Sequence, residues 1–190
     1  MREYIVFCGY AGLSGCIKLI KRYYGELGSY FNENYLKGLI NHVKENGYYG
    51  RYLSPVYNER DYLKPVDINT IFTGFSDEII PVGAGGILAG LYNMAKCRKC
   101  GFEIEIKKIN TIQICIEICE YYGLNIYRLL SEGMLILSED PYKDLYILRE
   151  NNISSELIGR LTKGLDKIII DKEVPEYVNR PGQDEIFKVV

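Results

Sequence analysis

A glycine-rich stretch in the middle of the chain, Val82-Gly83-Ala84-Gly85-Gly86-Ile87, separates a strand-like run from a helix-like run. Residues 77–82 predict a short strand, and the apolar positions that follow the glycines recur at the 3.6-residue period of a helix. A direct passage from strand to helix is typical of domains that pack helices against a sheet. This stretch therefore predicts a local passage from a strand to a helix.

The same alternation of strand-like and helix-like segments runs through most of the chain. Phe102, Ile104 and Ile106 alternate with charged residues, which predicts a strand with one solvated face and a sheet that is not entirely parallel. We expect an α/β (α+β) fold, a three-layer domain with a mixed sheet of about four to six strands. The predicted strands are 4–8, 77–82, 102–106, 134–137, 157–162 and 167–170, and the predicted helices begin near Ser14 and Asn34 and cover 87–95, 112–122 and 141–149.

Composition and charge exclude several classes of protein. The chain has 190 residues, of which 23 are basic and 25 acidic, and no cluster of Lys and Arg stands out. The electrostatic signature of a nucleic-acid-binding protein is missing, so we expect no nucleic acid partner. The apolar run at residues 4–9 is too short for a signal peptide or a membrane span, so we expect a cytoplasmic protein without membrane contact.

The central glycine turn is the strongest local site candidate. Gly83, Ala84, Gly85 and Gly86 precede a predicted helix, where free backbone N–H groups and the helix dipole favour an anion such as phosphate. A tight turn that allows close packing is the competing interpretation. A dinucleotide-binding fingerprint is disfavoured, because Leu88 stands where a third small residue would be needed.

A second glycine turn, at residues 9–15, precedes the first predicted helix. Gly12, Ser14 and Gly15 form a second candidate anion site, in which the Ser14 hydroxyl would cap the helix or bind an oxyanion. Here the structural interpretation is favoured over the functional one.

Six cysteines raise the alternatives of a zinc site or a redox pair. Cys97 and Cys100 are followed by Cys115 and Cys119, but the spacing is poor for zinc, and the last two lie in an apolar predicted helix. We therefore interpret Cys115 and Cys119 as buried core thiols and predict no metal site. His42 is expected to be solvated.

Two further features are weighed for function. Asp77 and Glu78 are adjacent, so their side chains point to opposite faces of a strand and do not form an acid/base pair. We predict no catalytic residues. The tyrosine-rich segment 48–62 is either a partner-binding or ligand-binding loop or an element that the pattern does not reveal.

Ordered matches at 85–95, 101–104, 118–125 and 131–135 resemble the C-terminal domain of the AIR synthase-related superfamily. The beginning, Ile5-Val6-Phe7-Cys8-Gly9-Tyr10-Ala11-Gly12-Leu13-Ser14-Gly15, and the end, Pro181-Gly182-Gln183-Asp184-Glu185-Ile186-Phe187, are similar to its hydrogenase maturation factor branch, within the AIR synthase / selenophosphate synthetase superfamily. The resemblance omits about residues 47–75. It implies that residues 1–190 form a single domain of this type.

Members of this superfamily join an N-terminal ATP-binding domain, which supplies Mg-binding aspartates, to a C-terminal domain that helps to close the phosphate site. The resemblance implies that this N-terminal domain is absent from residues 1–190. The family turn Asp-x-Thr-Glu/Arg-Gly-Gly is here Pro81 to Gly86, without the carboxylate and hydroxyl, and the Pro-Arg-Ile-Cys tail is replaced by Phe187-Lys188-Val189-Val190.

We accordingly expect an accessory or anion-binding protein without complete catalytic machinery. The alternative is half of a split ATP-dependent enzyme that a separately encoded ATP-binding domain completes. No cofactor is expected in this chain, since ATP and Mg²⁺ would enter only if a partner supplies the site. The expected partners are a second copy of the chain or such an ATP-binding protein.

Overall fold

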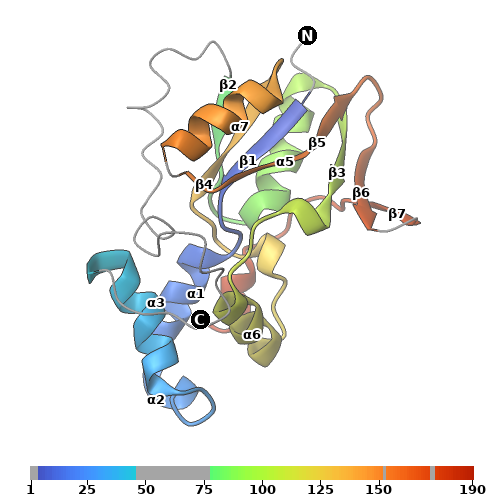
Figure 1. Cartoon of the computed structure of the whole chain (residues 1–190). Coiled ribbons are helices and arrows are strands. Elements are labelled where there is room, and N and C mark those ends of the chain that lie inside the picture. Colours follow the sequence, from blue (N-terminus) through green and yellow to red (C-terminus); the bar gives the residue numbers. More distant parts are fainter. Residues whose placement is uncertain (1–3, 46–77, 152, 172–173) are drawn as a thin grey trace.

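The computed structural model describes residues 4–45, 78–151, 153–171 and 174–190, with the backbone alone described for 41–45. Its strands form one mixed sheet in the order β2-β4-β1-β5-β3-β6-β7 (Figure 1). The β3–β6 pair is parallel and the other neighbouring pairs are antiparallel. The strands are β1 (Tyr4–Gly9), β2 (Glu78–Pro81), β3 (Gly101–Glu105), β4 (Gly133–Ser138), β5 (Ser155–Thr162), β6 (Lys167–Asp171) and β7 (Val174–Tyr177).

Strand β1 lies inside the sheet, and both of its faces are buried. Ile5 and Phe7 belong to the main core, whereas Val6 and Cys8 belong to a smaller core, because successive side chains of a strand point to opposite faces. Helix α5 (Gly86–Arg98) covers the face of the main core, and α7 (Pro141–Glu150) covers the other face (Figure 1). The predicted three-layer domain with a mixed sheet is therefore confirmed.

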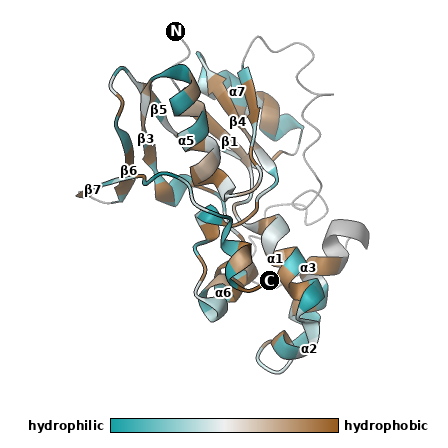
Figure 2. Ribbon diagram, turned by 180° about the vertical axis from the view of Figure 1, so that it is seen from behind, coloured by the Kyte–Doolittle hydropathy of each residue, from teal (hydrophilic) through white to brown (hydrophobic). Residues whose placement is uncertain are grey.

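The remaining helices gather at one end of the sheet and extend the main core (Figure 2). Their apolar residues belong to the main core, and several of these side chains are completely buried. The helices are α1 (Leu13–Arg22), α2 (Tyr24–Leu27), α3 (Glu33–Glu45) and α6 (Gln113–Tyr122), and the short 3₁₀ turns are η1 (Ile106–Lys108), η2 (Ile126–Arg128) and η3 (Glu185–Lys188). None of the helices in the described ranges combines the length and apolarity needed to span a bilayer.

The structure corrects two sequence-based expectations about the sheet. The expected four to six strands were too few, because β7 also pairs with β6. Its side chains are all exposed and it contains Pro175, so neither hydropathy nor alternation reveals it. Ile106 was also placed wrongly in a strand, since β3 ends at Glu105, where its parallel pairing with β6 ends, and Ile106 begins η1.

Predicted helix boundaries agree with the structure at two positions. Pro141 is the first residue of α7, and the Asp140 side chain accepts a hydrogen bond from the Lys143 N–H. Gly123 ends α6 in the left-handed conformation. The side chain of His42, Asp77 and the segment 48–62 lie outside the described parts of the chain.

Candidate functional site

The turn from β2 to α5 has the backbone geometry of a close-packed glycine turn. Gly85 and Gly86 have φ angles of 79° and 65°, in the left-handed region that favours glycine. A Cβ on Gly86 would lie 2.5 Å from the Tyr127 carbonyl oxygen and 2.7 Å from the Leu129 carbonyl oxygen. A Cβ on Gly83 would meet no atom within 4 Å. The inner side of the turn is therefore packed against the chain, and its outer side faces open space at Gly83.

A carboxylate from the C-terminal segment occupies the N-terminus of α5. The Gly85 N–H donates a 2.6 Å hydrogen bond to Oδ2 of Asp184, and the N–H groups of Leu130 and Ile186 donate to Oδ1 at 3.2 and 2.9 Å. Asp184 is only 6% exposed. Helix N-termini favour anions because the helix dipole adds to the unpaired N–H donors. The turn thus holds an anion, and that anion belongs to the chain itself.

The second glycine turn has a structural anchor rather than an open cradle. Gly12 precedes α1 with φ 70°, and its N–H donates to the Ser131 hydroxyl at 2.8 Å. A Cβ on Gly15 would overlap the Leu129 side chain. Ser14 does not cap the helix as predicted, because α1 begins at Leu13 and the nearly buried Ser14 lies within it.

Both predicted glycine turns pack against the same segment, residues 125–131. The inner side of Gly86 faces carbonyl groups of this segment, and the Gly15 N–H donates to the Leu130 carbonyl at 2.9 Å. The segment therefore brings the two predicted sites together. Asp184 joins this arrangement but was absent from the predicted site residues, because a carboxylate about a hundred positions away gives no local signal.

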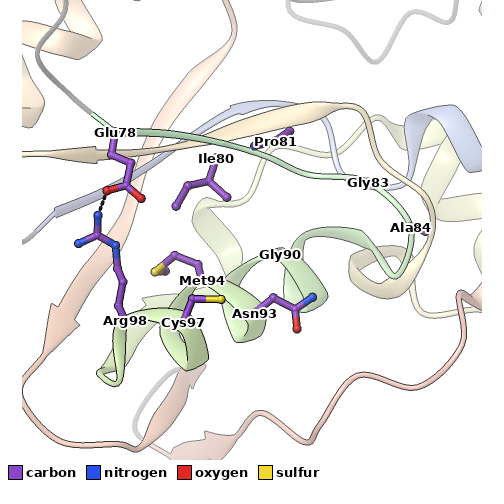
Figure 3. Close-up of a pocket in the computed structure, with 10 residues that line it drawn as sticks. All are labelled: Glu78, Ile80, Pro81, Gly83, Ala84, Gly90, Asn93, Met94, Cys97 and Arg98. Carbon is purple, nitrogen blue, oxygen red and sulfur yellow. Dashed lines mark ion pairs between the residues drawn. The ribbon is translucent and has the colours of Figure 1, made fainter.

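A groove of about 340 Å³ begins at the central glycine turn and runs between β2 and α5 (Figure 3). Gly83 and Ala84, which belong to the turn, line one end of the groove. Glu78 of β2 and Arg98 of α5 form an ion pair across the groove (Figure 3). The remaining lining residues are Ile80, Pro81, Gly90, Asn93, Met94 and Cys97. This volume is at the lower end of the range for small-molecule sites.

The cysteines are free thiols, and the predicted core position of two of them is confirmed. Cys115 and Cys119 are buried beside Cys16, whose sulfur lies 3.8 Å from that of Cys119. Hydrogen bonding to these two cysteines and burial raise the pKa of the Cys16 thiol well above its ordinary value. Within the described residues, no group of three or more His, Cys, Asp or Glu side chains is arranged to hold a metal ion.

A second buried polar contact lies under α7, away from the glycine turns. The Ser138 hydroxyl at the end of β4 donates to Oδ2 of Asp144, and both side chains are nearly inaccessible to solvent. Burial and the Asp144 charge raise the pKa of the Cys8 thiol above its ordinary value. Since Cys8 is completely buried and its thiol is held protonated, it lacks the properties of a nucleophile.

The chain matches no protein-family model and no curated protein sequence. Solved structures, in contrast, match it over nearly its full length. HypE, a hydrogenase maturation protein from E. coli, matches 97% of the chain with a TM-score of 0.67 and 15% sequence identity, over 51% of HypE. Thiamine-monophosphate kinase from Stenotrophomonas maltophilia matches 89% of the chain with a TM-score of 0.54 and 15% identity, over 50% of that kinase. This chain has the AIR synthase-related fold.

Two further structures with the AIR synthase-related fold match the chain to a similar extent. The kinase from Aquifex aeolicus matches 95% of the chain with a TM-score of 0.57 and 14% identity, over 52% of that protein. A HypE in complex with ATP matches 98% of the chain with a TM-score of 0.63 and 14% identity, over 52% of its length. The chain therefore spans about half the length of the structures that share its AIR synthase-related fold.

Proposed function

We propose that this chain is an accessory or anion-binding protein with the hydrogenase maturation factor-like form of the AIR synthase-related fold, and that it lacks complete catalytic machinery. The observation that supports this proposal most directly is the composition of the central glycine turn. Between Gly83 and Gly86 its largest side chain is the Ala84 methyl group, and its Gly85 N–H is bound to the chain's own Asp184. Such a turn can hold an anion by its backbone but has no side chain to coordinate a cation or move a proton.

Two further observations support a non-catalytic role. In the groove, the Glu78 carboxylate forms an ion pair with Arg98, so it is not a free acid/base group. The buried thiols of Cys8 and Cys16 have raised pKa values, so they are poor nucleophiles. None of these three side chains is therefore suited to act as an acid, a base or a nucleophile.

The experiment is a measurement of ATP hydrolysis by the purified chain with Mg²⁺. We expect no phosphate release above that of a mock purification from cells lacking the gene. Activity that co-purifies with the chain over two successive columns and reaches multiple turnovers would contradict the proposal. Titration with inorganic phosphate, monitored at the glycine amides by NMR, tests the anion-binding part separately.

The second candidate is half of a split ATP-dependent enzyme completed by a separate ATP-binding domain. The observation that favours it is that one of the matched structures, of which the chain covers about half, is a HypE crystallised with ATP. One matched HypE was also solved in complex with HypF, which supports a role for partner proteins. In this case the chain would work as a complex with that ATP-binding domain. The other expected partner is a second copy of the chain.

Co-expression with candidate ATP-binding-domain proteins encoded beside this gene tests the split enzyme. We expect a stable complex that hydrolyses ATP only when both chains are present. Separate elution of the two chains, together with an inactive mixture, would remove this candidate. Sedimentation of the chain alone shows whether it self-associates.

A further inference from the structure

The contacts of Asp184 extend beyond those of a simple turn. Its two carboxylate oxygens accept hydrogen bonds from three N–H groups, which belong to the start of α5, to residue 130 and to η3. The side chain is 6% exposed, so these bonds are shielded from water and salt. A charge-assisted bond to a backbone N–H is stronger than one between neutral groups. Asp184 therefore fills the anion position at the N-terminus of α5.

The segment that carries Asp184 is attached to the rest of the molecule at both ends of η3. The Glu185 carboxylate accepts from the Asn125 N–H at 3.1 Å, and the Tyr23 hydroxyl donates to the Val189 carbonyl at 2.6 Å. Ile186 and Val189 pack against the main core. The C-terminal segment is thus positioned across the surface on which both glycine turns meet.

We propose that Asp184 is an internal anion that competes with external anions for the N-terminus of α5, so that the C-terminal segment is an autoinhibitory contact. This inference rests on the proposed anion-binding function and specifies how that site is regulated. An external anion approaches from the open side of the turn at Gly83, and it gains the Gly85 N–H only when the Asp184 carboxylate leaves. A partner that displaces residues 184–189 would open the site by the same route.

The test compares the full-length chain with Asp184→Ala and Asp184→Asn. The alanine variant removes both the charge and the volume of the carboxylate, and the asparagine variant removes the charge but keeps the size. Asp166→Asn, at an exposed aspartate on the turn before β6, is the control for the loss of one negative charge. Circular dichroism verifies that each variant is folded.

Inorganic phosphate is the probe, and amide chemical shifts of residues 83–86 are the readout. We expect Asp184→Ala to bind phosphate about tenfold more tightly than the unmodified chain, with Asp184→Asn between them and Asp166→Asn unchanged. If Asp184→Ala does not fold, a gain in Asp184→Asn alone supports the inference and its absence overturns it.

Other outcomes separate the two proposals. Equal phosphate binding by the unmodified chain and both Asp184 variants overturns autoinhibition but leaves the anion-binding function intact. No phosphate binding by any of the folded proteins overturns both autoinhibition and the anion-binding part of the proposed function. A gain that Asp166→Asn shares is a general charge effect and also overturns autoinhibition.

Discussion

Gly83 and Gly86 lie three residues apart in one turn, but their surroundings differ. Gly86 has a positive φ angle, and a Cβ added there would lie 2.5 to 2.9 Å from backbone atoms of residues 127–129. Gly83 has no positive φ angle, and a Cβ added there would have open space around it to a distance of 4 Å. The requirement for glycine at position 86 is therefore both conformational and steric.

We expect Gly86→Ala to lower the free energy of unfolding by roughly 2–4 kcal/mol, from backbone strain and overlap with two carbonyl groups. Gly83→Ala is the matched control and should change it by less than about 0.5 kcal/mol. Urea denaturation followed by circular dichroism measures both. Equal stability of the two variants would show that the turn has another conformation in solution.

Glu185 is the acidic neighbour of Asp184, and the pKa of its carboxyl is lowered. Burial raises the pKa of its carboxyl, but hydrogen bonds from the Lys188 ammonium and the Asn125 N–H outweigh this effect and hold the pKa below its ordinary value. The folded state therefore favours the carboxylate. Its contribution to stability is complete above the unfolded pKa and is lost as the pH falls through the lower, folded pKa.

We expect Glu185→Gln to lose less stability than the unmodified chain between about pH 5 and about pH 3, because this ionisation is then absent. Urea midpoints measured across that range give the slope. Glu132→Gln, at an exposed turn, is the control and should retain the slope of the unmodified chain. An identical slope in Glu185→Gln would place the acid sensitivity in other carboxylates.

At the scale of elements, α7 is held on the sheet by apolar packing and by a buried polar contact. Leu145 and Leu148 enter the smaller core, and Ser138 donates to Asp144 beside it. A buried carboxylate that loses a hydrogen-bond donor has a large desolvation cost. The Ser155 hydroxyl is also buried but has no hydrogen-bond partner within the described residues.

These two serines form a test of how α7 is attached. We expect Ser138→Ala to lower the free energy of unfolding by about 1–3 kcal/mol, whereas Ser155→Ala should be nearly neutral, because no bond is broken there. Thermal and urea unfolding of both variants provide the comparison. A larger loss in Ser155→Ala would mean that its hydroxyl is bonded in solution.

The two edge strands of the sheet share a feature that limits strand addition. Pro81 and Pro175 lie opposite Met134 and Ile170, in pairs that alternate with the hydrogen-bonded pairs of each ladder. The neighbouring Val82 and Val178 N–H groups donate inward, to the Gly133 and Lys167 carbonyls. Each proline therefore removes a donor that would point outward from the edge. This arrangement disfavours partners that would extend the sheet.

At the scale of the whole molecule, the C-terminal segment connects the helical end of the domain to the α5 turn. Tyr23, at the end of α1, donates to the Val189 carbonyl at 2.6 Å. We expect Tyr23→Phe to accelerate amide hydrogen exchange in residues 185–190 several-fold while leaving the sheet amides unchanged. The control is Tyr142→Phe, on the exposed face of α7, which should leave the exchange pattern unaltered.

Much of the architecture was predictable because it follows local patterns. The alternation of Phe102 and Ile104 with charged residues gave β3, the 3.6-residue period gave α5, and Pro141 gave the start of α7. Strand β7 was not predictable, since its exposed side chains carry no hydropathy signal and its pairing with β6 is what defines it.

The sequence by itself determined the fold class and the positions of the two glycine turns, since periodicity and glycine placement act over a few residues. Tertiary structure alone decided what those turns contact. The segment 125–131 meets both turns, and Asp184 reaches Gly85 from 99 positions away. Such contacts depend on how the helices and the C-terminal segment pack, and the local spacing of residues does not predict that packing.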